Sequence, residues 1–452
     1  MVSFQHRGDT TKIASSAHPN SLLGVTEPAG PGGAVVDCVR SLRVVTMRGV
    51  KVPDVVFTMS AASAMTTLGA IPVFLLSAQS VFIRRDLGFD EARFGLAVSC
   101  FFAAAATTAL LGGGLVDRLG RRRSTLLAGT ISVLGGAGLA LGAHSYAALV
   151  ATLIILGMAN AAMQVTSNLS LAKSIPLHRQ GLAFGVKQSA IPFAIVLGGL
   201  AVPSVGVIIG WRWTFGITAI LAILVIIGGL FLPPDSVTRA TVQGSVEKAP
   251  TMALALTAAA MAVASAAVNS LGAFLASWGF QIGMTPSQTG FLMAAGSGLS
   301  IVARVLTGHR ADRRGGRNLP VVAMQMLFGS AALAAISIDN IPTLWVSAIL
   351  AFAVGWAWPG LMLFAVVRVG REAPGAASGA VQAGAFIGGA SGPALFGLLV
   401  VHMDYPFAWR VASLFLAIAA GMVFLARRMF LRDLEVRPFS PGVSAHPRPG
   451  PP

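Results

Sequence analysis

Long apolar runs separated by short polar segments are the main feature of this sequence. Each run holds about 20 residues or more, the length that an α-helix needs to cross ~30 Å of hydrocarbon. The apolar positions are continuous and do not alternate, which excludes the strands of a membrane β-barrel. The pattern predicts membrane-spanning helices over residues 55–80, 93–116, 124–143, 146–171, 181–209, 214–232, 252–279, 290–307, 319–338, 343–367, 375–401 and 408–426.

These runs form two groups of six, separated by a polar linker and flanked by two polar tails. We expect both tails to be disordered, because they hold too few apolar residues to form a core. For the first tail, an alternative is that translation starts near Met47. We predict an all-α polytopic membrane protein with two pseudo-symmetric six-helix bundles, divided into N-tail 1–54, first bundle 55–232, linker 233–250, second bundle 251–427 and C-tail 428–452.

The composition agrees with a protein whose solvent is largely lipid. Hydrophobic residues make up 55 % of the 452 residues, charged residues 11 %, and the mean hydropathy is +0.77. Soluble domains carry about 25 % charged residues, so this chain could not cover a water-facing surface of its size. An ordinary soluble enzyme is excluded, and the lipid bilayer is the expected surrounding.

The net charge of +16 would suggest nucleic acid in a soluble domain, but the positions of the cations explain it differently. An even number of spans puts both tails on one side, together with the basic segments 117–123 and 308–317. Lys and Arg gather in cytoplasmic loops, so we place both termini in the cytoplasm, at the inner or plasma membrane, with no nucleic-acid partner. The exceptions are Arg84, Arg85, Arg93, Arg212 and Arg410 in the opposite loops, and Lys187 and Arg304 within spans.

The two halves of the chain repeat one another. The segment that starts at Gly113, GGLVDRLGRR, corresponds to GHRADRRGGR at Gly308, 195 positions later. Such landmarks, in the same order and at nearly one offset, indicate a duplicated six-helix unit. The further matches are Gly88 with Gly283, Gly95 with Gly290, Gln188 with Gln382, and Trp211 with Trp409.

The spacing Gly-x-x-x-Asp-Arg-x-Gly-Arg-Arg at residues 113–122 resembles the loop signature of the major facilitator superfamily, whose members have two such halves. The resemblance covers roughly residues 55–427. It implies a secondary carrier that works by alternating access. Within the superfamily, segments 185–189 and 379–384 look like the cyanate-transporter-like branch of small-anion and organic-acid carriers.

The resemblance also implies that the motif forms a latch between the halves on the cytoplasmic side. The Asp117 carboxylate can accept hydrogen bonds from Arg121 or from a helix N-terminus. The alternative is that the arginines only follow the rule for cytoplasmic loops, and the second copy has Gly316 where the first has Arg121. The predicted latch residues are Gly113, Asp117, Arg118, Gly120, Arg121, Gly308, Asp312, Arg313 and Arg317.

No acidic residue falls in the middle third of a predicted span. Proton relays in transporters usually run through buried carboxylates or His, so the sequence argues against an acid-dependent cation exporter. Lys187 lies inside the fifth span, where its ammonium either extends to the cytoplasmic surface or attracts an anion at the floor of a central cavity. We expect Arg304, one turn before Gly308, to extend to the surface.

Other polar residues within the spans are candidates for the same cavity. Asn160 and Gln164 are four residues apart and share one helix face; the alternative is a hydrogen bond between helices, which contributes about 0.6 kcal/mol. The predicted substrate-binding residues are Lys187, Gln188, Asn160, Gln164, Asn269, Trp356, Gln382 and Thr67. We expect a small-molecule substrate, leave a coupling ion open, and expect a monomer.

The predicted function is transport of a small anion or organic acid. The alternative is an efflux antiporter for drugs or metabolites. The absence of a central carboxylate disfavours this alternative. The fifth span also disfavours it, because it lacks the Gly-Pro dipeptide that exporters of the family carry. A membrane receptor without transport is a third interpretation. We expect no enzyme, no cofactor and no metal, because no catalytic cluster or phosphate-binding loop is present, and Cys38 and Cys100 offer neither a disulfide framework nor a metal site.

Overall fold

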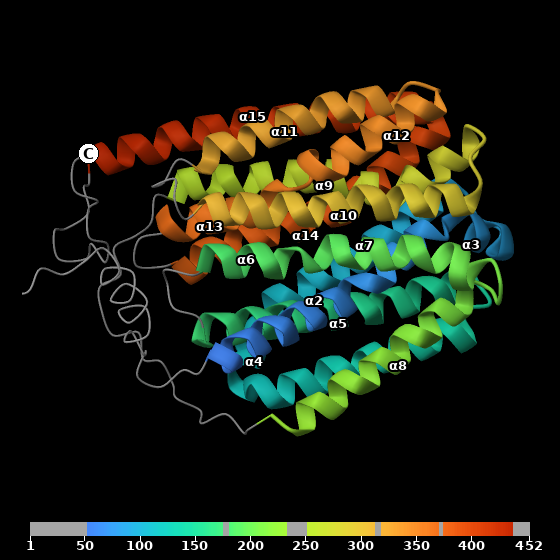
Figure 1. Ribbon diagram of the computed structural model, residues 1–452, viewed down its shortest axis with the longest axis horizontal. Helices are drawn as coiled ribbons and strands as arrows, with labels where there is room; N and C mark the ends of the chain where they lie inside the picture. Colours follow the sequence, from blue (N-terminus) through green and yellow to red (C-terminus); the bar gives the residue numbers. More distant parts are fainter. Residues whose placement is uncertain (1–51, 175–179, 233–250, 312–317, 370–373, 437–452) are drawn as a thin grey trace, which may run out of the picture. The chain divides into compact units, whose positions relative to one another are not determined.

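Each predicted span is helical in the computed structural model, which describes residues 52–174, 180–232, 251–311, 318–369 and 374–436 (Figure 1). The first six spans are built from α2 (Val52–Ala78), α3 (Ser80–Leu87), α4 (Glu91–Gly142), α5 (Tyr146–Ser174), α6 (Gln180–Gln188), α7 (Ala190–Ala201), η2 (Val202–Gly206) and α8 (Trp211–Leu230). The second six are built from α9 (Thr251–Gln281), α10 (Pro286–Ala311), α11 (Asn318–Ile336), α12 (Ile341–Leu350), η3 (Ala351–Gly355), α13 (Trp358–Val369), α14 (Pro374–His402) and α15 (Tyr405–Val436). Twelve of the described helical stretches have the length and apolarity to cross a membrane, and the described residues contain no strand.

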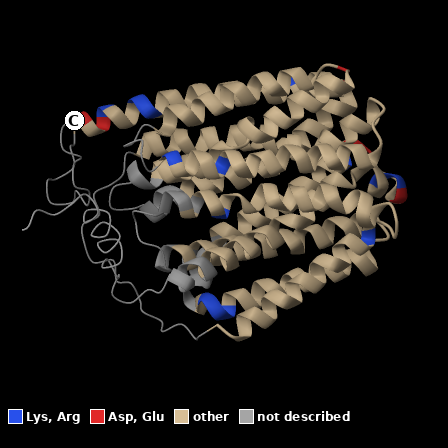
Figure 2. Cartoon of the chain, in the orientation of Figure 1, with Lys and Arg blue, Asp and Glu red and all other residues tan. Residues whose placement is uncertain are grey.

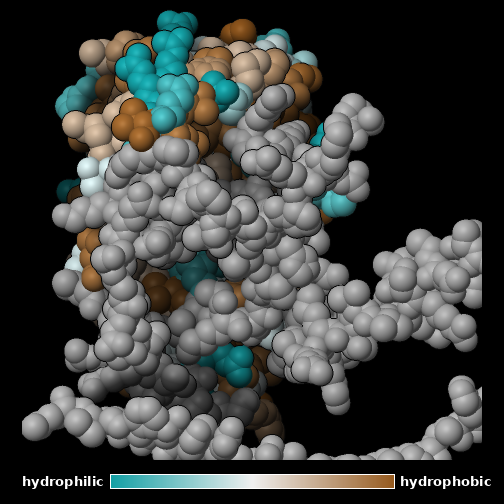
Figure 3. Space-filling model, turned by 90° about the vertical axis from the view of Figure 1, so that its left-hand side faces the viewer, coloured by the Kyte–Doolittle hydropathy of each residue, from teal (hydrophilic) through white to brown (hydrophobic). Residues whose placement is uncertain are grey.

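The spans lie side by side and run back and forth between two ends of the bundle (Figure 1). We call the end where α8 stops and α9 begins the linker end, and the opposite end the α3 end. Figure 2 shows Lys, Arg, Asp and Glu gathered mainly at these ends, with uncharged residues along the length of the helices. In Figure 3, which looks at the linker end, hydrophilic residues gather over the end of α15.

Large apolar side chains are exposed along the outside of the bundle. On α8, Ile220 and Leu224 are 61 % and 58 % exposed. A water-soluble protein rarely exposes so continuous an apolar surface, and a lipid bilayer would cover it. The exposed apolar surface of the helices thus agrees with the low fraction of charged residues in the sequence.

Several element boundaries differ from the prediction. The second and third spans are two helices that follow one another directly within α4, and they meet at a kink where the backbone of Gly120 is non-helical, with φ 73. This left-handed conformation favours glycine, so the turn of the motif is tighter than the predicted loop. The last helix, α15, continues to Val436, ten residues past its predicted end, because charged side chains allow it to leave the lipid without unwinding.

The repeated glycines have two structural roles. Gly88 and Gly283 both have positive φ, 67 and 101, in the turns that precede α4 and α10. Gly95 and Gly290 allow the halves to touch: a Cβ atom at Gly95 would lie 2.1 Å from the carbonyl oxygen of Pro393 on α14, and one at Gly290 would lie 2.5 Å from an oxygen of α7. Equivalent glycines of the two halves therefore make equivalent contacts across the interface, which fits a duplicated unit.

Candidate functional site

A cavity of about 70 Å³ lies between the two halves, in the middle of the spans. The first half contributes side chains from α2, α4, α5, α6 and α7, and the second from α9, α10, α13 and α14. Its lining mixes apolar and carboxamide side chains with one guanidinium: Ala70, Val73, Phe74, Phe101, Phe102, Asn160, Gln164, Gln188, Ile191, Met261, Ser265, Asn269, Arg304, Trp356, Pro359, Gln382, Ala385 and Phe386. Among these lining residues, Arg304 is the one cation and none is acidic.

The structure brings six of the eight predicted substrate-binding residues together on this cavity: Asn160, Gln164, Gln188, Asn269, Trp356 and Gln382. Two carboxamide oxygens, Asn160 Oδ1 and Gln188 Oε1, are buried without a hydrogen-bond partner. Buried polar atoms are nearly always paired, so a site with such atoms suits water or a polar ligand. The aromatic residues of the lining, apart from Trp356, were not predicted, because a Phe within an apolar span carries no signal that separates the cavity from the lipid.

Lys187 lies one side chain away from the cavity. It is 1 % exposed, and its ammonium donates a hydrogen bond of 2.6 Å to Oε1 of Gln164, which does line the cavity. The alternative that Lys187 extends to the membrane surface is therefore wrong. Lys187 was also predicted to lie at the floor of the cavity, but Gln188 and Gln164 line the cavity and Lys187 does not. Because Oε1 of Gln164 is occupied, the amide nitrogen of this side chain is the group left for a ligand.

The expectation for Arg304 was wrong: the side chain turns inward and does not extend to the surface. It is 2 % exposed and lines the cavity. Its guanidinium donates to the carbonyl oxygen of Gln188 at 2.6 Å and to that of Trp356 at 2.5 Å. Since Gln188 belongs to the first half and Trp356 to the second, Arg304 joins the halves at the cavity.

A proline explains why the Gln188 carbonyl is free to accept this bond. In an α-helix the N–H of residue i donates to the carbonyl of residue i−4, and the residue four positions after Gln188 is Pro192, which has no N–H. The helix breaks at this place into α6 and α7. Arg304 supplies the donor that the helix lacks, and this arrangement could not be predicted from the sequence, because the donor lies far from Pro192 along the chain.

Thr67 does not line the central cavity. Its hydroxyl donates to the carbonyl oxygen of Ala190 at 3.3 Å, and its side chain lines a separate, mainly apolar groove of about 660 Å³ between α2, α7 and α8. Thr67 thus ties the first span to the fifth.

The described part of the latch motif consists of Gly120, Arg121 and Gly308. Gly120 makes the turn described above, and Arg121 is half-buried. Gly308 lies against the first half, with its Cα 3.6 Å from the position of a Cβ at Gly185. Asp312, Arg313 and Arg317, and the positions of Gly113, Asp117 and Arg118 within residues 111–118, lie outside the residues whose side chains are described.

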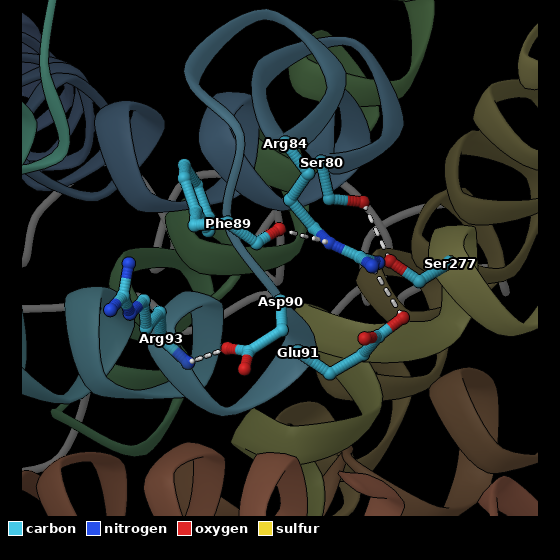
Figure 4. Close-up of polar contacts among 7 residues, drawn as sticks. All are labelled: Ser80, Arg84, Phe89, Asp90, Glu91, Arg93 and Ser277. Carbon is cyan, nitrogen blue, oxygen red and sulfur yellow. Dashed lines mark hydrogen bonds and ion pairs between the residues drawn. The ribbon is translucent and has the colours of Figure 1, made fainter.

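At the α3 end, polar contacts close the bundle beyond the cavity (Figure 4). Ser80 and Ser277, one from each half, are 2.9 Å apart through their hydroxyl oxygens. Arg84 forms an ion pair of 2.5 Å with Glu91 and also donates to the carbonyl of Phe89. The guanidinium of Arg85 lies 4.8 Å from the ring centre of Phe280 in the other half. The bonds of Arg84 lie within the first half, whereas the contacts of Ser80 with Ser277 and of Arg85 with Phe280, together with the glycine contacts of α4 and α10, hold the halves together at this end.

Comparison with known families places both halves in one group. The family model described as Major Facilitator Superfamily matches residues 55–259 and again residues 256–450. The two matches follow one another along the chain, as the internal repeat does.

Individual relatives differ in how much of the chain they cover. A D-xylose transporter of Levilactobacillus brevis is 32 % identical over 160 residues, 35 % of each chain. A glucose transporter, GlcP, of Staphylococcus epidermidis is 27 % identical over 159 residues, again 35 % of each chain. A chloramphenicol resistance protein of Streptomyces lividans is 26 % identical over 344 residues, 73 % of this chain and 85 % of that protein. The chain therefore spans about a third of the length of the sugar transporters.

Proposed function

Because the chain belongs to the major facilitator superfamily, we propose that it is a secondary active transporter that moves a small anion or organic acid across the membrane by alternating access. The observation that carries the anion part is Arg304, the one cation among the described residues of the cavity, with no acidic residue beside it. A buried charge without a counter-ion is costly, and an anionic substrate supplies that counter-ion. The amide nitrogen of Gln164 offers a second donor to the same substrate.

Arg304 also suggests how binding is coupled to movement. The guanidinium has five N–H groups, and its bonds to the carbonyls of Gln188 and Trp356 join the first half to the second. An anion in the cavity would bind the same guanidinium, and it would thereby change the strength of the two hydrogen bonds that join the halves. The two bundles, 55–232 and 251–427, would then rock about the substrate, with the motif around Asp117 as the latch at the linker end and the linker 233–250 between them.

We propose further that the protein lies in the inner or plasma membrane with the linker end in the cytoplasm, and that it acts as a monomer. The excess of Lys and Arg in the tails and linker-end loops supports this orientation. No coupling ion is assigned, since no buried carboxylate among the described residues indicates one.

Uptake into proteoliposomes tests the proposal. Arg304→Gln should lower the uptake of small carboxylates by at least about 10-fold, because a hydrogen bond to a charged group contributes about 1.5–3 kcal/mol. Arg304→Lys keeps the charge but has no planar fork to reach two carbonyls, and should retain part of the activity. Arg410→Gln, an exposed cation at the α3 end, is the matched control and should transport normally. Normal carboxylate uptake by Arg304→Gln would remove the basis for an anionic substrate.

Export of a neutral aromatic compound is the second candidate. It is favoured by the Phe and Trp side chains of the cavity and by the match over 73 % of this chain to a protein named for chloramphenicol resistance. In the same proteoliposomes, transport of chloramphenicol that does not depend on Arg304 would support this candidate over the first.

A further inference from the structure

We infer that the cavity selects small 2-hydroxy acids, which carry a neutral hydrogen-bond donor beside the carboxylate, over acids of the same size that have no hydroxyl group. This inference rests on the proposed function and names the substrate class of the same site. It is carried by the juxtaposition of the Arg304 guanidinium with two buried carboxamide oxygens that have no hydrogen-bond partner among the described residues.

These two oxygens belong to Asn160 and Gln188. The side chains are 3 % and 4 % exposed, and both line the cavity. Oδ1 of Asn160 and Oε1 of Gln188 are the atoms without a partner, and a buried acceptor is costly unless a donor pairs with it. A plain carboxylate brings only acceptors, so it would displace water from these oxygens without replacing its hydrogen bonds. A ligand with an O–H group of its own can pair with them.

The donors for a carboxylate line the same cavity. Arg304 donates to the carbonyl oxygens of Gln188 and Trp356, and its Nε is buried without a partner among the described residues. The Lys187 ammonium, which can only donate, holds Oε1 of Gln164 at 2.6 Å and so sets the orientation of that carboxamide. The amide nitrogen of Gln164 is therefore a donor for the ligand. Arg304 and Gln164 together provide the groups that a carboxylate needs.

The acceptors and the donors are close enough to share one small ligand. Asn160 and Gln164 are one turn apart on α5, which places their Cβ atoms about 5–6 Å from one another on the same face. The carbonyl of Gln188 contacts Arg304, so this side chain starts next to the guanidinium. A 2-hydroxy acid has its hydroxyl on the carbon atom beside the carboxylate. It can therefore place the carboxylate on Arg304 and Gln164 and donate its hydroxyl hydrogen to Asn160 or Gln188.

The charge of the lining decides between a hydroxyl and an ammonium as the donor of the ligand. None of the described lining residues is acidic, so the ammonium of an amino acid would come close to Arg304 without a counter-ion. Burying a charge in this way is strongly unfavourable, whereas a hydroxyl is neutral. A 2-hydroxy acid is thus favoured over the 2-amino acid of the same shape.

The cavity volume of about 70 Å³ is room for a few waters, since one water needs about 10–15 Å³ of such a volume. Small probes of equal size are therefore the appropriate ligands for a test. Glycolate, propionate and glycine have the same number of non-hydrogen atoms. They differ in the group at the end away from the carboxylate, which is a hydroxyl, a methyl or an ammonium.

Thermal unfolding of the purified full chain in nanodiscs with these three probes tests the inference. Glycolate should raise the melting temperature at concentrations at least about 10-fold lower than propionate, because propionate leaves both carboxamide oxygens unpaired. Glycine should have no effect at the glycolate concentrations. Glycolamide, the neutral counterpart of glycolate, should have none either.

Variants at the two oxygens test the site itself. Asn160→Leu and Gln188→Leu each replace a carboxamide by an apolar group of similar size. The variant that removes the acceptor of the hydroxyl should bring glycolate and propionate to equal effective concentrations. Gln325→Leu is the matched control and should leave the difference unchanged, because Oε1 of Gln325 is also buried without a partner among the described residues but does not line the cavity. Comparing two ligands on each variant separates a change in selectivity from a general loss of stability.

The outcomes separate this inference from the proposed function. If propionate or glycine acts at the same concentrations as glycolate, or if neither variant changes the difference between glycolate and propionate, the inference is wrong and the anion carrier stands. The same holds if none of the three probes binds while proteoliposomes take up labelled nitrate or succinate. If glycolamide is as effective as glycolate, or if no anion is bound or taken up, the anionic substrate itself is wrong, and with it both proposals.

Discussion

Pro192 offers the most direct test of how Arg304 joins the halves. Pro192→Ala restores an N–H at the position that faces the Gln188 carbonyl in a helix. That carbonyl now accepts from Arg304 at 2.6 Å, and the new helical bond would compete for it. The change touches neither the charge of the cavity nor any residue of its lining.

The expected size of the effect follows from the bond that is displaced. A hydrogen bond that involves a charged group contributes about 1.5–3 kcal/mol, which corresponds to roughly a 10- to 150-fold change in an equilibrium. The connection between the halves at the cavity should weaken by up to this factor. Overall thermal stability should not fall, because removing a proline from a helix interior is favourable by about 3 kcal/mol. The connection between the halves should therefore weaken while the thermal stability of the protein does not fall.

Distances between spin labels at the linker end measure the connection. Labels at Arg123 and His309, both exposed and one from each half, can be placed in a background without Cys38 and Cys100. Pro192→Ala should shift the distribution toward larger or broader distances. Pro203→Ala, eleven positions further along the same span, is the control and should leave the distribution as it was. An unchanged distribution in Pro192→Ala would refute the argument that the proline frees the Gln188 carbonyl for Arg304.

Three further predictions concern the latch, the buried lysine and the interface. Asp117→Asn should abolish transport at normal protein levels if the carboxylate is a latch, and normal uptake would contradict that role. Lys187→Met should raise the KM for the transported carboxylate about 10-fold or more, because it releases Gln164. Adding Gln164→Leu to this variant should raise the KM little further. Additive effects on the KM in the double variant would show that the two side chains do not act as a unit. Gly290→Ala puts a Cβ 2.5 Å from a carbonyl oxygen of α7 and should destabilise the protein by about 1–3 kcal/mol in thermal unfolding, whereas Gly298→Ala on the same helix has open space and should be silent.

The sequence predicted the fold well because the bilayer imposes a strong rule on it. Every span must satisfy its own backbone hydrogen bonds, so a continuous apolar run of sufficient length has to be helical. Breaks within spans were harder to predict. The separation of α6 from α7 depends on a proline whose neighbouring carbonyl is satisfied by a residue 116 positions away, and no local pattern contains that information.

The bilayer also explains why part of the site could be predicted from the sequence. Carboxamides such as Asn160 and Gln382 are rare in lipid-facing positions, so their presence alone pointed to the interior. For charged residues the position along the helix was misleading: Arg304 lies close enough to the end of α10 to reach the surface, and only tertiary contacts show that it turns inward. Phe386 and Phe291 could not be told apart from the sequence, although one lines the cavity and the other is half exposed.

The two halves keep their symmetry where they pack and lose it where the cavity carries charge. At the offset of the repeat, Gly95 and Gly290 make matching close contacts. The two buried cations have no such counterparts: Lys187 corresponds to Val381, and Arg304 corresponds to Ala109. A carrier that closes alternately at either end needs equivalent contacts in both halves, and duplication supplies them. A site with a single cation is unequal by nature, so the cation of one half must correspond to an uncharged residue at the equivalent position of the other, as Arg304 corresponds to Ala109.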